Sequence, residues 1–558
     1  MRPDEITRKI LEIRGIVSED DIREFLSPKP QLSHDPFLLP EMEAGVAFLL
    51  DKLKTDKRIC IYGDYDVDGI CGTAIMTLFF RDAARIIRSE AEITYYIPDR
   101  IEEGYGLNNT ALKDIRDSGA DTVVTVDCGS ISAREVAYAK EIGLDILITD
   151  HHDPDPDSLP ECIHINPKLK MPEGGYPFGG LSGAGVAFKL CGALQRHLGE
   201  EKALLNKFVD LACVATIADV VPLVNENRTI VKYGLSMLRS GKRPALRELL
   251  AVSGTDPAGL DVRDVAYRIA PRLNAIGRLS DGAKGVELFL SEDEARIREL
   301  AEDMNSLNTE RQLIQEKCFQ ECMALFDSLD VEDGKPVEKF LLLKPTSSHE
   351  GVAGIVAGKV REATGFPCAV LTASAGEDGE FLKGSARSGG RLDITALLRR
   401  HSGLFERLGG HAAAAGFLIR ADNEALLREA LARDLEAMLG ADETLLDSRE
   451  EAELEIELSD VSLELAEALR QLAPFGKGNP APTLSLDVEA KEIGGVRRIG
   501  QNSAHLKFLA GGIGFIFFDG AATVFPKEGK IRVFGCPQIN EWNGRREIQF
   551  AVSRIDLV

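Results

Sequence analysis

The chain has 558 residues, of which 44% are hydrophobic and 28% are charged, and its formal net charge is −24. This length predicts roughly three or four domains, and no apolar stretch reaches the roughly 18 residues of a membrane span. The N-terminal segment lacks the apolar core of a signal peptide, so we expect a cytoplasmic protein. The ten cysteines contain no Cys-x-x-Cys pair, which favours reduced thiols over a structural zinc site.

The acidic balance argues against a nucleic-acid partner, because phosphate binding needs local positive charge. One stretch of this acidic chain is basic. Residues 381–411 hold six lysines and arginines against two acids. Charge alone leaves two interpretations open, an ordinary solvated face or a local phosphate-binding groove.

The first elements predict a parallel sheet. Residues 1–45 indicate a short helical extension with a Pro-rich end, and residues 46–290 then alternate strands with helices. Such alternation is typical of a parallel sheet with crossover helices. The predicted strands are residues 58–63, 92–97, 121–127 and 145–149, and the predicted helices are residues 70–87, 112–118, 132–142, 186–198 and 204–218.

The later elements predict three further parts. A periodic stretch at 292–326, without glycine or proline, indicates a long connecting helix within 291–332. A second α/β region follows at 333–441. After 442, short strands separated by turns indicate a small antiparallel barrel, up to 558. The predicted strands of these two regions are residues 340–344, 368–372, 484–488, 504–509, 514–518, 530–534 and 547–552, with a helix at 426–439.

The strongest chemical signal is the position of the acids and histidines. Three predicted strands run directly into them, and an apolar helix ends in one more aspartate. Ligands of an open parallel sheet bind beyond the carboxyl ends of its strands, so we expect these side chains to converge. Crowded carboxylates raise one another's pKa, and divalent cations remove that penalty. The set is Asp64, Asp66, Asp68, Asp127, Asp150, His151, His152 and Asp219.

Mixed carboxylate and imidazole ligands suit manganese, with magnesium or zinc as alternatives. A carboxylate that bridges two cations would hold them about 3.5–4 Å apart, the spacing of phosphoryl-transfer sites. A lone aspartate after a strand is usually a turn or helix-cap residue. The coincidence at three strand ends favours a two-metal site over that ordinary role.

Several motifs resemble a known family. DYDVDG at 64–69, VDCG at 126–129, DHH at 150–152 and ADVVPL at 218–223 resemble the four motifs of the DHH phosphoesterase superfamily. Other stretches, across about residues 50–558, resemble the bacterial RecJ family. These are YYIPDRIEEGYGL (95–107), PRLNAIGRL (271–279), HEGVAGIVAGKV (349–360), GSARSGG (384–390), LGGHAAAAGF (408–417) and PFGKGNPAP (474–482).

The resemblance implies an α/β multidomain architecture: a parallel-sheet DHH domain, a long helix, a DHH-associated α/β domain and an OB-like antiparallel barrel. It implies a 5′-to-3′ exonuclease of DNA repair and recombination that degrades single-stranded DNA to 5′ mononucleotides. The hydrolysis would use two divalent cations, Mn²⁺ or Mg²⁺. A monomer is expected, with single-stranded DNA as partner and with a helicase and a single-strand-binding protein as further partners.

The resemblance also implies residue roles. Tyr62 stands where some relatives have a histidine ligand, so Asp64 is a candidate replacement. Trp542, beside Asn543 and Gly544, is the expected exposed aromatic of the barrel. The implied metal ligands are Asp64, Asp66, Asp68, Asp127, His151 and Asp219, with Asp127 as the bridge, and the implied catalytic groups are Asp127, Asp150, His151 and His152. The implied 5′-phosphate and DNA contacts are Arg100, Tyr105, Leu107, Arg272, Arg278, Ser385, Arg387, Arg391 and His411.

Two other functions compete with this one. A phosphoesterase for pyrophosphate or very short oligonucleotides would use the same metals but would not need the barrel and the long helix. A non-catalytic replication scaffold would have lost ligands, whereas this sequence keeps its acids and its DHH triplet. The exonuclease is therefore the preferred hypothesis.

Overall fold

The computed structural model describes residues 1–29, 33–100, 102–170, 174–199, 205–332, 335–376, 379–447, 451–500, 503–542 and 545–558. The chain divides into two compact units, which we describe separately. One unit comprises residues 1–273, 282–298 and 450–558, and the other comprises residues 274–281 and 299–449. None of the described helices is both long and apolar enough to cross a membrane.

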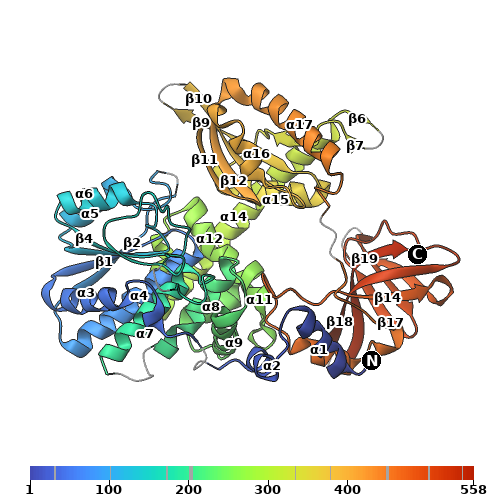
Figure 1. The fold of residues 1–558 in the computed structure, drawn as a ribbon, viewed down its shortest axis with the longest axis horizontal. Coiled ribbons are helices and arrows are strands. Elements are labelled where there is room, and N and C mark those ends of the chain that lie inside the picture. Colours follow the sequence, from blue (N-terminus) through green and yellow to red (C-terminus); the bar gives the residue numbers. More distant parts are fainter. Residues whose placement is uncertain are drawn as a thin grey trace. The chain divides into compact units, whose positions relative to one another are not determined.

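A five-stranded sheet in the order β2-β1-β3-β4-β5 forms the centre of the first unit, and all of its strands are parallel. Helices α3, α4 and α7 cover one face, and α5 and α6 cover the other (Figure 1). The middle strand β3 is buried at every position, as expected for a sheet covered on both faces. The elements are α3 (Met42–Thr55), β1 (Arg58–Gly63), α4 (Val67–Ile87), β2 (Glu92–Tyr96), α5 (Asn109–Asp117), β3 (Thr122–Val126), α6 (Ala133–Glu141), β4 (Asp145–Thr149), β5 (Ile163–Ile165) and α7 (Gly183–His197).

A helical layer extends this domain. Helix α8 is almost entirely apolar, and it packs against α4, α7 and α9. A helix that is apolar all round belongs in a core, and Leu211 to Ile217 are indeed buried. The layer consists of α8 (Val209–Ala218), α9 (Asn225–Arg239), α10 (Pro244–Val252), α11 (Val262–Asp264) and α13 (Ala283–Leu290). Helix α12 (Ala270–Leu279) begins in the first unit and ends in the second.

The second unit has its own mixed sheet, in the order β11-β12-β10-β9-β8. Among the described pairings of this sheet, only that of β8 with β9 is parallel. The long helix α14 begins in the first unit and continues into the second. The elements are α14 (Glu294–Asp327), the short pair β6 (Val331–Glu332) and β7 (Lys335–Pro336), β8 (Leu341–Leu343), α15 (Glu350–Thr364), β9 (Cys368–Gly376), β10 (Gly379–Arg387), α16 (Ile394–Arg399), β11 (Phe405–His411), β12 (Ala414–Arg420) and α17 (Glu424–Ala441).

The C-terminal residues of the first unit form a seven-stranded, mainly antiparallel sheet, in the order β13-β14-β18-β19-β17-β16-β15. Its core contains Phe508, Phe515 and Phe550, and also Ile6, Ile10 and Leu11 of the N-terminal helix α1. The predicted N-terminal extension therefore packs into the C-terminal core. The elements are α1 (Pro3–Ile13), α2 (Glu19–Leu26), β13 (Leu454–Glu455), α18 (Leu463–Arg470), β14 (Leu484–Glu489), β15 (Gly494–Ile499), β16 (His505–Ala510), β17 (Ile513–Phe517), β18 (Lys530–Trp542) and β19 (Arg545–Leu557).

The predicted fold class is confirmed, with a parallel sheet near the N-terminus, a long helix and a mainly antiparallel C-terminal sheet. Two differences stand out. Strands β10, β11 and β12 were not predicted, and β18 and β19 are each 13 residues long. Asn543 and Gly544 lie outside the described residues, and the side chain of Trp542 is not described, so its exposure stays a prediction.

Candidate metal centre

The carboxyl end of β1 leads directly into the first group of acids. Asp66 is the N-cap of α4, and its Oδ1 accepts hydrogen bonds from the backbone N–H of Asp68, 2.8 Å away, and of Gly69, 3.2 Å away. This cap holds the turn between strand and helix. Gly69 is required there, because an added Cβ would lie 2.3 Å from the carbonyl oxygen of Asp64. Local capping thus places three aspartates at one edge of the sheet.

The N-terminus of α7 holds the carboxylate of Asp68. Its Oδ2 accepts from the N–H of Gly183, at 2.6 Å, and its Oδ1 from the N–H of Ala184, at 2.8 Å. Free N–H groups and the helix dipole make such a terminus a site for anions. Gly183 also lets Asp127 approach, because an added Cβ would lie 2.5 Å from Asp127 Oδ1. No local pattern in the sequence indicated this role for Gly183.

Asp127 follows β3 in a left-handed backbone conformation, with φ of 63°. Such a conformation costs a non-glycine residue roughly 1–3 kcal/mol. Its N–H donates to the carbonyl oxygen of Thr149, 3.1 Å away, which ties it to the end of β4. The strained turn aims the side chain of Asp127 at the acids that follow β1 and α8.

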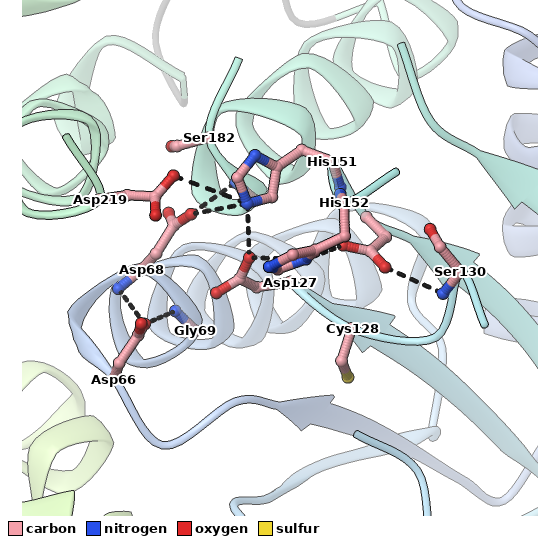
Figure 2. Close-up of polar contacts among 12 residues, drawn as sticks. Asp66, Asp68, Gly69, Asp127, Cys128, Ser130, His151, His152, Ser182 and Asp219 are labelled. Carbon is pink, nitrogen blue, oxygen red and sulfur yellow. Dashed lines mark hydrogen bonds and ion pairs between the residues drawn. The ribbon is translucent and has the colours of Figure 1, made fainter. Parts of the chain in front are cut away.

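His151 lies at the centre of the cluster (Figure 2). Its Nε2 is 3.1 Å from Asp127 Oδ1, 3.6 Å from Asp219 Oδ2 and 3.8 Å from Asp68 Oδ2. Burial is the largest cause that lowers the pKa of His151, to about 4, so the ring is neutral at pH 7. A neutral imidazole nitrogen facing three carboxylates is a metal-ligand arrangement.

Crowding and burial together raise the pKa values of these carboxylates. Burial, followed by the charge of Asp66, raises the pKa of Asp68 to about 6. Burial, followed by the charges of Asp68 and Asp66, raises the pKa of Asp219 to about 8. The pKa of Asp127 and that of Asp64 are raised well above the ordinary range, chiefly by burial.

Four buried atoms at the centre form no hydrogen bond with the described residues. They are Asp64 Oδ1, Asp127 Oδ1, His151 Nε2 and Asp219 Oδ2. Buried polar atoms are rarely left without a partner. Three overlapping groups could each hold a cation, with their ligand atoms all within 4.8 Å of one another: Asp64, Asp66 and Asp127; Asp68, His151 and Asp219; and Asp127, His151 and His152. This donor set fits two divalent cations, with Asp127 shared between them.

Asp150 differs from Asp64, Asp127 and Asp219 because neither of its carboxylate oxygens is left without a hydrogen bond. It accepts from the backbone N–H groups of Ser130, His151 and His152, at 2.9, 2.7 and 3.1 Å. It also pairs with His152 Nδ1 at 2.8 Å. Burial alone would raise the pKa of Asp150, but the bond to His152 and its charge lower it overall. Asp150 therefore positions the histidines.

A second buried network, missed by the sequence analysis, holds this corner. Ser130 Oγ lies 3.0 Å from His164 Nε2 and accepts from Asn166 Nδ2 at 2.8 Å. The same amide nitrogen donates to the carbonyl oxygen of His152, 2.8 Å away. The only signal was the strand at 163–165, where a histidine stands in an apolar run. The loop that carries the DHH triplet is thus held on both sides.

The structure shows what the side chains of Tyr105, Tyr62 and Leu107 contact near the centre. The hydroxyl of Tyr105 donates to the carbonyl oxygen of Asp127, 3.2 Å away, and lies 3.0 Å from His152 Nδ1. Tyr62 is fully buried and donates to the carbonyl oxygen of Gly106 at 2.9 Å, so it fixes a loop and does not face the metals. Leu107 is only 6% exposed and belongs to the core around Tyr62, so its base contact stays a prediction.

The second unit brings Ser385 and Arg387 together on one face of β10, opposite Gly354 of α15. An added Cβ at Gly354 would lie 2.8 Å from Arg387 Nη2 and 3.7 Å from Ser385 Oγ. Burial lowers the pKa of Arg387, which forms no ion pair with the residues that the structure describes. A half-buried guanidinium beside a hydroxyl is suited to a phosphate.

The other predicted contacts are dispersed. Arg391 is engaged with Asp442 at 2.7 Å, and His411 is exposed at the end of β11. Arg278 donates to the carbonyl oxygen of Gly351 at 2.5 Å, near the start of α15. Arg272 stands on α12 and donates to Arg268 in the first unit, while Arg100 lies 4.8 Å from the ring of Tyr65. Their DNA-binding roles stay predictions.

Comparison with known proteins places this geometry in a family. Family models match residues 58–216 (DHH family, N-terminal domain), 338–437 (DHHA1 domain) and 452–554 (RecJ OB domain). The single-stranded-DNA-specific exonuclease RecJ of Dickeya dadantii is 34% identical, over 93% of this chain and 91% of that protein. The chain belongs to the RecJ family.

Other RecJ proteins agree with this placement. RecJ of Bacillus subtilis is 34% identical, over 98% of this chain and 67% of that protein. The crystal structure of RecJ in complex with Mn²⁺ from Thermus thermophilus matches with a TM-score of 0.80 and 28% identity, over 100% of this chain and 78% of that chain. A RecJ structure with Mg²⁺ from the same organism matches with a TM-score of 0.75 and 27% identity, over 98% of this chain and 74% of that chain.

The substitution Asp127→Asn removes one charge at the centre and tests carboxylate repulsion and metal binding separately. In the metal-free protein, Asp127→Asn should raise the midpoint of thermal unfolding by a few degrees, because it relieves carboxylate repulsion. The same variant should lose most of the stabilisation that Mn²⁺ gives the parent protein. Thermal unfolding with and without Mn²⁺ measures both, and Asp117→Asn on the exposed face of α5 is the control. A variant that keeps the full Mn²⁺ gain would contradict the assignment of Asp127.

Metal binding should depend on pH through the same carboxylates. The folded pKa values of Asp68 and Asp219, about 6 and about 8, lie above the unfolded value of about 4. The metal-free fold therefore loses stability as the pH rises from about 4 through 8, because the unfolded state releases these protons first. Mn²⁺ should displace the same protons, so its affinity should rise between about pH 6 and pH 8. Calorimetry in buffers of different ionisation enthalpy measures the protons released, and an absence of release would refute the shared site.

Proposed function

We propose that this chain is a metal-dependent exonuclease that degrades single-stranded DNA from the 5′ end to 5′ mononucleotides. The observation that carries the proposal is the set of three overlapping ligand groups, in which Asp127 belongs to two groups and His151 belongs to two. The DHHA1 and OB segments add the parts that a long single strand needs and a small-molecule phosphoesterase does not. Retention of the whole acidic set disfavours a non-catalytic scaffold.

Mn²⁺ or Mg²⁺, held by Asp64, Asp66, Asp68, Asp127, His151 and Asp219, would activate water and stabilise the charge of the displaced oxygen. The side chains around the cations have separate tasks. Asp150 fixes both histidines through their backbone N–H groups. Burial alone would lower the pKa of His152, but its bond to Asp150 raises it to about 9. His152 is therefore protonated at pH 7, and it could donate this proton to the leaving oxygen.

The 5′ polarity would come from the second unit. The half-buried guanidinium of Arg387 and the hydroxyl of Ser385 face one spot over Gly354, where a terminal phosphate could accept their hydrogen bonds. Recognition of the terminal phosphate would favour strands with a free 5′ end. Arg391, Arg278 and His411 are further candidates for backbone contacts.

A role in DNA repair and recombination follows for an enzyme of this activity. A cytoplasmic location, a monomeric state and cooperation with a helicase and a single-strand-binding protein are further parts of this proposal. They rest on the resemblance of the motifs.

The decisive experiment is a time course on 5′-labelled and 3′-labelled single strands and on a duplex, with Mn²⁺ or Mg²⁺. We expect mononucleotides from the 5′ end of the single strand, and a stable blunt duplex. Asp127→Ala should abolish cleavage but leave single-strand binding measurable. Faster turnover of pyrophosphate or of dinucleotides than of long strands would reject the exonuclease.

The phosphate pocket has its own test. Arg387→Ala should lower kcat/KM on a 5′-phosphorylated strand on the order of 10-fold more than on a 5′-hydroxyl strand, because only the former presents the terminal phosphate. Arg399→Ala, which removes an exposed arginine of α16, should affect both substrates little. Equal losses on both substrates in Arg387→Ala would remove this residue from the pocket.

A further inference from the structure

A tight turn in the C-terminal part of the first unit touches the connection that carries Asp219. The turn runs from Gly476 to Asn479, whose backbones pair at 2.9 and 3.1 Å. Gly478 has φ of +74°, as the third position of a type II turn requires. The carbonyl oxygen of Lys477 accepts from the N–H of Leu223, 2.7 Å away, in the segment between α8 and α9.

The base of this turn is held by buried polar groups. Asn479 is 1% exposed, and its amide donates to the carbonyl oxygens of Leu472 and Pro474 at 2.9 and 2.8 Å. Arg228 of α9, itself 2% exposed, donates to the carbonyl oxygens of Leu472 and Ala473 at 3.0 and 2.8 Å. Burial of a guanidinium is costly unless its donors are satisfied. The turn is therefore fixed against the metal-binding domain.

The close packing leaves no room for other residues around the turn. An added Cβ at Gly476 would lie 2.7 Å from Leu223 Cδ1, and one at Gly478 would lie 3.0 Å from Pro222 Cβ. Lys477, between them, is exposed and forms no ion pair with the described residues. The turn therefore presents one lysine from a rigid support.

The backbone contact of Lys477 with Leu223 places the turn four residues along the chain from Asp219. The charge of Lys477 opposes the burial that raises the pKa of Asp219. Other cations near the centre are already engaged: Lys168 pairs with Asp153 at 3.1 Å, and Arg100 lies over the ring of Tyr65. Lys477 is thus a cation at the edge of the metal centre with no other partner in the described structure.

We propose that the ammonium group of Lys477 binds a phosphate oxygen of the DNA strand beside Asp219, and so acts as a substrate-positioning residue of the reaction. The residue comes from the C-terminal domain, outside the DHH motifs. The inference rests on the proposed exonuclease function, since it needs a nucleic-acid phosphate at the metals.

The physical reason is charge. A phosphodiester that enters a cluster of aspartates meets repulsion from every carboxylate that the metals do not neutralise. A lysine is a compact point charge on a flexible stem, suited to follow a phosphate from the bound state to the transition state. Because the structural contact of Lys477 uses its backbone carbonyl, its side chain can be changed without disturbing the turn.

The test compares Lys477→Gln, Lys477→Arg and the parent protein on a 5′-phosphorylated single strand with Mn²⁺. Lys477→Gln should lower kcat/KM on the order of 10- to 100-fold, and Lys477→Arg should restore much of it. The slope of log Kd against log salt should fall by about one in Lys477→Gln, because one phosphate contact is lost. The thermal midpoint and its Mn²⁺ gain should equal those of the parent.

Lys491→Gln, which removes an exposed lysine elsewhere in the same domain, is the matched control and should behave as the parent protein. An active parent with an equally active Lys477→Gln variant and an unchanged salt slope overturns the role of Lys477 alone. If Lys477→Arg loses as much kcat/KM as Lys477→Gln, the phosphate contact is overturned. A parent protein that does not degrade single strands overturns the exonuclease and this inference together.

Discussion

The mutual repulsion of buried carboxylates is the constraint on which this structure depends. Asp64, Asp68 and Asp127 are each less than 5% exposed. Oxygens of Asp68, Asp127 and Asp219 lie within 3.8 Å of the Nε2 atom of one neutral imidazole. Nearby cations such as His152 and Lys477 offset only part of that charge, since the pKa of Asp219 stays raised. Folding alone therefore leaves an energetic deficit that divalent cations remove. Hydrogen bonds from backbone N–H groups offset part of this energetic cost. The start of α7 faces Asp68, and a cap at the start of α4 engages Asp66.

The aspartates divide into two kinds by how their oxygens are used. Asp150 is saturated by backbone N–H groups and a histidine, and its pKa is lowered. Asp127 and Asp219 keep an oxygen without a hydrogen bond, and their pKa values are raised. Hydrogen bonds to the charged form favour it, whereas burial without them disfavours it. Neighbouring residues of one motif therefore serve as support and as candidate ligands.

Much of this architecture follows from the sequence, because it depends on local pattern. Strands β1 and β4 are found at the predicted residues, and the acids that follow them converge as the parallel topology requires. Strands β10 and β12 escaped prediction because GSAR and AAGF are rich in small residues and poor in β-branched ones.

The residues that support the metal centre could not be predicted from the sequence, for a different reason. Gly183 and His164 act through contacts with residues far away in the chain, and no local periodicity in the sequence predicts those contacts. Arg228 is the clearest case, because a charged residue in an amphipathic helix is ordinarily a solvated one. Its burial against the turn at 476–479 becomes visible only in three dimensions.

The packing of α1 into the C-terminal core has a consequence for biosynthesis. Ile6, Ile10 and Leu11 leave the ribosome long before Phe515 and Phe550, which share their core, have been made. The apolar face of this helix must stay exposed, or be shielded by a chaperone, while the domains between are being translated. The hydrophobic core of this seven-stranded sheet is completed only when both segments have been made, so its assembly follows the translation of the domains between them.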